Sequence, residues 1–113
     1  MKKFLVLYRM DMGAMRKMMT ENPDMGKKGM EEWGMWMKKN MSNFADAGAP
    51  TGKNSEVSAN GAVEKSNDIG GYSILQAESK EAAAAILKDN PHLKMPGATI
   101  DLAEVVSMGE PRQ

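Results

Sequence analysis

The sequence predicts one α+β domain, in which an antiparallel sheet carries two helices on one face. Three observations predict it. The chain has 113 residues, the length of a single domain. Short apolar runs typical of strands alternate with two stretches of helical pattern. Apolar residues make up 42% and charged residues 27%, as in ordinary globular proteins. We expect the domain to span 1–107 and a frayed tail to follow over 108–113.

The first strand is predicted at residues 4–8, an aromatic and aliphatic run bounded by charges. Both alternating faces of this run are apolar, which is typical of a strand covered on both sides. Residues 10–23 are rich in methionine, and Asn22-Pro23 stops a helix. We therefore expect a loop over the body of the protein, with at most a turn of helix at 14–19.

A long helix is predicted from Asp24 to about Gly48. Gly48 and Pro50 supply ordinary helix stop signals. Apolar side chains recur at spacings of three and four residues, which places them on one stripe of the helix. These side chains are Met30, Trp33, Met37, Met41 and Phe44.

The second half of the chain predicts a hairpin, a strand, a short helix and a last strand. The hairpin lies within 51–65, around the turn signal Asn60-Gly61. The strand covers 69–77, and Ser79 caps the helix that follows it. The last strand covers 99–106. This order is close to the ferredoxin-like β-α-β-β-α-β arrangement.

The sheet face away from the helices is predicted to be too apolar for water. Exposing several such side chains would cost several kcal/mol at about 25 cal/mol per Å², comparable with the stability of a small domain. A second copy of the sheet is the simplest cover, so we expect a homodimer. The face should carry some of Leu5, Leu7, Ser73, Leu75, Thr99, Asp101 and Ala103.

The stretch from Val57 to Ser79 resembles the heart of the YCII-related (DGPF) family. Ile69-Gly-Gly-Tyr72 matches the family's Gly-Gly-Tyr segment, whereas Asn60-Gly-Ala-Val63 stands where the family carries Asp-Gly-Pro-Phe. Residues 32–37 and 97–102 resemble its first helix and closing strand. The resemblance implies a dimeric α+β barrel with a pocket near the subunit interface. YCII-type members are thought to use a His-Asp pair with the histidine in the first half of the chain, where this sequence has none, so that site is not transferred.

Composition limits the partners and cofactors. Fifteen basic residues balance fifteen acidic ones, so nothing favours nucleic acid or an anionic membrane. Cysteines are absent, which excludes disulfides and thiolate sites. The apolar run at the start is too short for a signal peptide or a membrane span, and we expect a cytoplasmic protein. Phosphate-loop and dinucleotide fingerprints are missing, so no cofactor and no metal are predicted.

Asp101 and His92 are the candidate acid–base residues. Alternation along the last strand places Asp101 opposite Ile100 and Leu102, hence toward the dimer interface. There it would serve a pocket, form a structural ion pair or lie exposed at the sheet edge. His92 is the only histidine and follows a helix end. It would bind free carbonyls, lie in solvent or shuttle a proton.

Four more residues are candidates for ligand binding. Tyr72 follows two glycines, so it would fill the core or border a pocket. Trp33 and Trp36 stand three apart on the long helix, so one would pack on the sheet and the other would border a pocket or a partner. Arg9 follows the first strand, where it would border the rim of a pocket or be a solvated surface residue.

Eleven of the thirteen methionines lie within residues 1–41. Thioethers can bind copper(I), but methionine also fills irregular cores and adaptable apolar surfaces. We expect core packing here.

The leading hypothesis for function is the binding of a small organic ligand between subunits. The alternatives are a cofactor-independent enzyme of the isomerase, lyase or monooxygenase type, by analogy with other dimeric α+β barrels, or a transcription-associated regulatory partner. Whether the chain is an enzyme stays open at this point.

Overall fold

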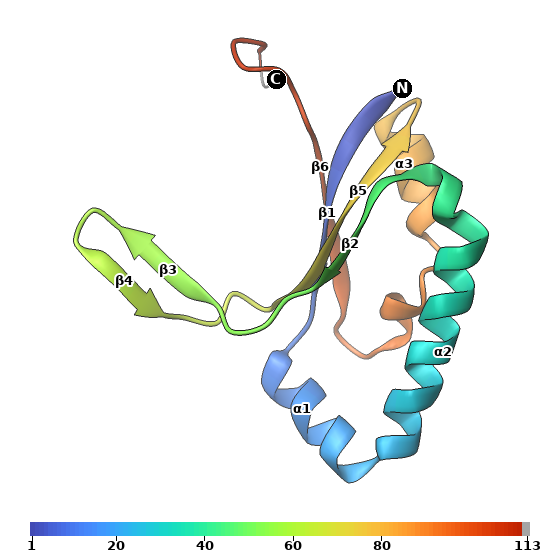
Figure 1. Cartoon of the computed structure of the whole chain (residues 1–113), viewed down its shortest axis with the longest axis vertical. Coiled ribbons are helices and arrows are strands. Elements are labelled where there is room, and N and C mark those ends of the chain that lie inside the picture. Colours follow the sequence, from blue (N-terminus) through green and yellow to red (C-terminus); the bar gives the residue numbers. More distant parts are fainter. Residues whose placement is uncertain (112–113) are drawn as a thin grey trace.

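A four-stranded antiparallel sheet organises the molecule, with helices on one of its faces (Figure 1). The computed structural model describes residues 1–111. The strand order β2-β5-β1-β6 is the ferredoxin-like order once the four strands are counted along the chain. The predicted α+β class and antiparallel sheet are confirmed. The strands are β1 (Lys2–Arg9), β2 (Phe44–Pro50), β5 (Ile69–Ala77) and β6 (Thr99–Glu104).

The pairing of the two central strands separates the faces of the sheet. Phe4 lies opposite Leu75, and Val6 lies opposite Ser73. All four side chains are buried on the helix side. The intervening residues of both strands point to the other face. The core on the helix side is completed by Tyr8, Trp36, Met37, Ala77, Ala83 and Leu87.

Helices α2 (Pro23–Asn40) and α3 (Lys80–Leu87) cover this core (Figure 1). Helix α2 begins with Pro23 in its first turn and ends with two lysines, which suits the helix dipole. Ser79 caps α3 as predicted, since its Oγ accepts a hydrogen bond of 3.1 Å from the backbone N–H of Ala82.

The methionine-rich segment predicted as a loop is largely helical. Helix α1 spans Met12–Glu21, and Asp11 caps it by accepting a hydrogen bond of 3.0 Å from the backbone N–H of Ala14. Asn22 and Pro23 end this helix and start the next one, so the stop signal marks a corner between two helices. Helix α1 has no buried residue.

The long helix predicted to reach Gly48 ends earlier. Asn40 donates a hydrogen bond of 2.9 Å to the carbonyl of Trp36. A 3-10 turn, η1 (Met41–Asn43), then leads into β2. Phe44, predicted on the apolar stripe of the long helix, is instead the first residue of β2. From there its ring still packs against Trp36, with 5.8 Å between the ring centroids. Local periodicity could not distinguish these two arrangements.

The predicted hairpin exists but lies outside the main sheet. Strands β3 (Ser55–Ser58) and β4 (Gly61–Glu64) pair only with each other. The sequence predicts that the hairpin contributes to the main sheet, between the first strand and the strand at 69–77 in chain order. In the structure β2 occupies that position. In Figure 1 the hairpin projects from the body on the side away from α2 and α3. We call β3, β4 and their turn the arm.

The second face of the sheet carries most of the residues predicted for it. Leu5 and Leu7 alternate with the buried positions of β1, so they point to this face. Thr99, Asp101 and Ala103 of β6 lie opposite β1 residues that point the same way, so they share the face. Ser73 and Leu75 were wrongly predicted here, because the register turns them to the helices. Tyr72 and Ile74 take their place. Within residues 1–111 no helix covers this face, which we call the open face.

Other sequence expectations meet the structure only in part. The last strand ends at Glu104, two residues earlier than predicted. The tail expected over 108–113 is described only to Pro111, and residues 112–113 lie outside the described part. No helix among residues 1–111 combines the length and the apolar character needed to cross a bilayer.

Gly48 provides a test of the β2–β5 pairing. Its φ is +77°, and a Cβ there would overlap the carbonyl oxygen of Tyr72. We expect Gly48→Ala to lower the free energy of unfolding by more than about 1 kcal/mol, because the backbone must move. Urea denaturation measures this change. Gly29→Ala on α2 is the matched control, since nothing lies within 4 Å of its added Cβ. Equal stability of the two variants would contradict the close approach.

Candidate functional site

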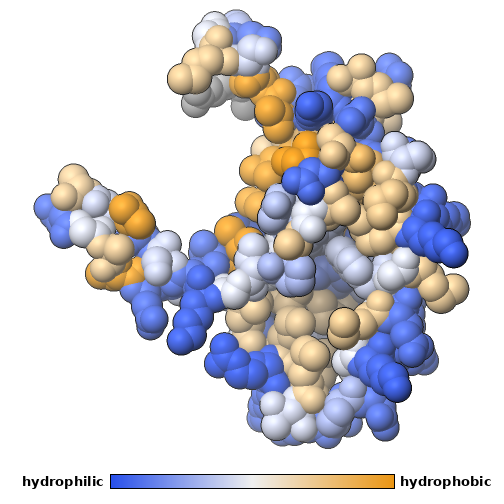
Figure 2. Space-filling view, viewed as in Figure 1, coloured by the Kyte–Doolittle hydropathy of each residue, from blue (hydrophilic) through white to orange (hydrophobic). Residues whose placement is uncertain are grey.

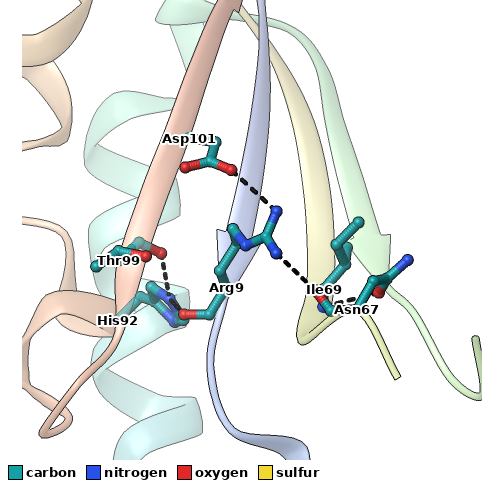
Figure 3. A network of polar contacts seen from close by, with 6 residues as sticks. All are labelled: Arg9, Asn67, Ile69, His92, Thr99 and Asp101. Carbon is teal, nitrogen blue, oxygen red and sulfur yellow. Dashed lines mark hydrogen bonds and ion pairs between the residues drawn. The ribbon is translucent and has the colours of Figure 1, made fainter. Parts of the chain in front are cut away.

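An ion pair lies at one corner of the open face (Figure 3). Arg9 at the end of β1 donates from Nη1 to Oδ2 of Asp101 on β6, at 3.1 Å. The two residues come together because Arg9 pairs with Thr99 in the ladder and Asp101 is two positions further along the same strand. The register of β1 on β6 therefore builds this contact.

The same guanidinium holds the turn that precedes β5. Arg9 Nη2 donates to the carbonyl of Asn67 at 2.8 Å. The Asn67 side chain in turn accepts from the backbone N–H of Ile69 at 3.1 Å, and Asp68 has a positive φ of 59°. Its carbonyl accepts a hydrogen bond of 2.8 Å from the Met10 backbone N–H. Arg9 thus joins β6 to the root of the arm.

His92 lies behind this corner with its ring committed to the backbone. Its Nε2 is 2.9 Å from the carbonyl oxygen of Arg9 and 3.0 Å from that of Thr99. Carbonyls only accept hydrogen bonds, so Nε2 carries the proton. The residue is 4% exposed. Of the predicted roles, carbonyl binding is the one the structure displays, and His92 ties the ends of β1 and β6 together.

The aromatic side chains gather on the helix side of the sheet. Tyr8 meets Trp33 edge to face, with ring centroids 5.0 Å apart, and Trp33 lies 6.1 Å from Trp36. Trp36 is buried and donates from Nε1 to Asp89 Oδ1 at 2.9 Å. The sheet therefore separates both tryptophans from the Arg9–Asp101 pair. From the sequence spacing, one of the two tryptophans was predicted to border a pocket.

The Tyr8 hydroxyl ends in a short hydrogen-bond chain inside the core. Ser73 Oγ donates to the carbonyl of Ala47 at 2.8 Å, which uses its only proton. Tyr8 must then donate to Ser73 Oγ across the 3.0 Å between them. Burial raises the pKa of the Tyr8 hydroxyl, and the neighbouring Ser73 hydroxyl partly offsets that rise. This chain ties β1, β2 and β5 beneath the open face.

Tyr72 shares the open face with the ion pair but does not touch it. It lies opposite Leu7 on β1, and Leu7 lies opposite Asp101 on β6. Two strand spacings separate Tyr72 from Asp101, about 10 Å. Arg9, Asp101 and Tyr72 therefore border one patch with Leu7 at its centre.

Asn67 and Thr99 complete the corner, and neither was predicted as part of a site. The available signal was the Ser66-Asn67-Asp68 run before two glycines, a turn-forming composition. That signal predicts a turn but not which side chain crosses to it. Only the strand register brings Arg9 to the Asn67 carbonyl.

The ion pair is solvated in the single chain. The side chains of Arg9 and Asp101 are 38% and 55% exposed, and pairs of this kind contribute about 0–1 kcal/mol. The apolar neighbours Leu5, Leu7 and Ile74 are partly exposed on the same face. In Figure 2 hydrophobic side chains line the side of the body that looks toward the space between the arm and the C-terminal segment.

Two open depressions lie away from this corner. One, of about 350 Å³, is formed by helix α1, and one of about 250 Å³ lies between α3 and β6. Methionines dominate the first, yet Met37 alone among the thirteen methionines is buried in the core. The expectation of core packing was therefore wrong for most of them. The first depression is lined by Met12, Met15, Arg16, Met19 and Thr20.

Comparison with known proteins gives a fold-level likeness only. No protein-family model matches the sequence, and no curated protein matches it. Among solved structures, a 5-chloro-2-hydroxyhydroquinone dehydrochlorinase (TftG) from Burkholderia phenoliruptrix AC1100, in complex with 2,5-dihydroxybenzoquinone, matches with 14% identity and a TM-score of 0.49. The match covers 88% of this chain and 90% of that chain. This identity and TM-score are too low to carry a residue role or an activity to this chain.

The raised pKa of Tyr8 predicts a loss of stability in alkali. The unfolded chain releases the tyrosine proton near pH 10, whereas the folded chain holds it to higher pH, so the folded state loses relative stability above about pH 10. We expect the free energy of unfolding of the wild type to fall more steeply above this pH than that of Tyr8→Phe. Urea denaturation on both sides of pH 10 measures it. Parallel pH profiles of the two proteins would contradict the prediction.

Proposed function

We propose that this protein works as a homodimer, with two open sheet faces packed together and a small organic ligand bound beside Arg9 and Asp101. The single observation behind the proposal is the apolar sheet face that the chain itself leaves uncovered. The helices shelter Phe4, Val6 and Leu75 on one side. Leu7, Tyr72 and Ile74 on the other side need a second cover.

The surface of the single chain supports a partner of substantial size. Its accessible area is 8276 Å², whereas a compact monomer of this mass exposes about 6,100 Å². Its radius of gyration is 15.6 Å, against about 13 Å for a compact domain of this length. The excess area, about 2,000 Å² per chain, falls in the range that each subunit of a stable homodimer buries.

The corner of the open face is where a ligand would fit. Sheets are twisted, so two that pack face to face approach closely at the centre and diverge toward their corners. Asp101 lies on the edge strand β6 near its start, and Arg9 ends β1 beside it. A ligand there would meet an apolar floor at Leu7 and a few polar groups, the composition typical of binding pockets.

The polar groups of the corner suggest the class of ligand. A guanidinium has five N–H donors, and two hydrogen bonds from it are seen here. Asp101 supplies carboxylate oxygens as acceptors. Donors and acceptors side by side over an apolar floor suit a small ring compound that carries a hydroxyl and a carbonyl group.

Binding is favoured over catalysis because neither acid–base candidate is poised for proton transfer. The Nε2 proton of His92 is shared between two backbone carbonyls. Asp101 is paired with Arg9, and its side chain is more than half exposed to solvent.

We also propose that the chain is a divergent relative of the YCII-related domains. The segment Ile69-Gly-Gly-Tyr72 begins β5, next to β1 at the centre of the sheet, and the arm occupies the place of the Asp-Gly-Pro-Phe turn. The altered turn residues Ala62 and Val63 are both exposed. Substitution there costs the fold little, which is consistent with divergence at this motif.

Dimerisation is tested by charging the open face. We expect sedimentation equilibrium to give a dimer for the wild type and a monomer for Ile74→Asp, because a carboxylate at the centre of the interface would be buried without a partner. Met35→Asp on the exposed surface of α2 is the matched control, since Met35 is 74% exposed. Ala103→Arg repeats the test near the edge of the face, and circular dichroism verifies that each variant folds. A wild-type monomer at micromolar concentration would refute the proposal.

Ligand binding is tested with a probe of the stated chemistry. We expect 4-hydroxybenzaldehyde to raise the melting temperature of the wild type and to shift backbone amide resonances around Leu7 and Thr99. Arg9→Gln and Asp101→Asn should each weaken binding at least tenfold, which corresponds to about 1.4 kcal/mol. Toluene, which lacks both polar groups, should bind more weakly than the probe. Unchanged affinity in both variants would exclude this corner as the site.

A further inference from the structure

The arm is the part of the fold that the chain itself leaves without support. All eight residues of β3 and β4 are exposed. Val57 and Val63 are 78% and 61% exposed. A two-stranded ribbon by itself is marginally stable in water, and its two unpaired edges invite another chain. Such a ribbon gains stability only when something else packs against it.

Both faces of the arm carry an apolar side chain. Val57 lies opposite Ala62, and Val63 lies opposite Glu56 in the next pair of the ladder. Neighbouring pairs point to opposite sides of a ribbon, so the two valines point in opposite directions. A ribbon intended only for solvent would need neither.

The root of the arm is fixed to the body. Thr51 continues the β2–β5 pairing, since its N–H donates to the carbonyl of Gly70 at 3.1 Å and its hydroxyl donates to that of Ile69 at 3.0 Å. The backbone N–H of Lys65 donates to the carbonyl of Asn54 at 3.2 Å. The hydrogen bond from Arg9 to Asn67 braces the returning strand. The arm therefore projects in a set direction.

That direction is toward the side of the sheet that has no helix. In Figure 1 the arm leaves one end of the sheet and the C-terminal segment leaves the other, and both project away from α2 and α3. The open face lies between them. A body placed on this face would be held at both ends.

We propose that the arm is a clasp that packs against the second copy of the chain, and that Arg9 sets its angle. The inference rests on the homodimer proposed above, because a second copy on the open face lies within the space that the arm borders. The exposed strands of the arm are part of the 8276 Å² that the chain exposes, so a second copy packed against them would bury area beyond the sheet. Arg9 is here a positioning residue, which links the ligand corner to the clasp through Asn67.

The clasp is tested first by its effect on dimer affinity. We expect Val57→Asp combined with Val63→Asp to raise the dimer dissociation constant at least tenfold in sedimentation or mass photometry. The matched control is Met25→Asp combined with Met30→Asp, two residues on α2 that are 56% and 73% exposed. It should leave the constant unchanged. An unchanged constant in the arm variant would overturn the clasp.

A spin label tests the position of the arm directly. The chain has no cysteine, so Val57→Cys and Val63→Cys each give one labelling site, one on each side of the ribbon. The less mobile of the two labels is the readout. We expect the nitroxide spectrum to be that of an immobilised label in the dimer and of a mobile label in Ile74→Asp. Arg9→Gln should mobilise the label in the dimer, whereas a conservative Arg9→Lys should restore part of the order. A mobile label in a wild-type dimer refutes the clasp and leaves the dimer standing, whereas a wild-type monomer refutes the dimer itself.

Discussion

The structure depends on the pairing of β1 with β5 at the centre of the sheet. This register places Phe4 on Leu75 and Val6 on Ser73, so one face is sealed by α2 and α3. The same register places Leu5 on Ile74 and Leu7 on Tyr72 on the other face. A slip by one residue would exchange the two faces. The closed core and the open face are therefore two results of one hydrogen-bond ladder.

The β1–β5 ladder ends at the C-terminal end of β1, where hydrogen bonds join separate parts of the chain. The guanidinium of Arg9 contacts β6 through Asp101 and the root of the arm through Asn67. The backbone carbonyl of Arg9 accepts a hydrogen bond from His92. The two contacts of the guanidinium are modest because they are exposed, whereas the His92 contact is partly buried. Together they fix the corner where the open face, the last strand and the arm meet. Covering the corner with a partner would lower the local dielectric and strengthen them.

The aromatic cluster performs the corresponding task on the closed side. Trp33 packs against Tyr8 and lies beside Trp36, and the Tyr8 hydroxyl is satisfied by Ser73. A small core with few large aliphatic side chains gains much of its buried area from these rings. The exposed methionines on α1 and α2 add little to that core, so most methionines of the first half lie at the surface and Met37 is the one in the core.

The sequence by itself determined the element types with strong local signals. Short apolar runs predicted the strands at 4–8 and 69–77, Ser79 predicted the cap of α3, and Asn60-Gly61 predicted the turn of the arm, because each signal acts over a few residues. Only the tertiary structure decided that Phe44 lies in a strand, that the arm stands outside the sheet, and that Arg9 reaches Asp101 and Asn67. These three features depend on which strands become neighbours and in which register. The contact of Arg9 with Asp101 spans 92 positions of the chain and that with Asn67 spans 58, so neither leaves a local pattern in the sequence.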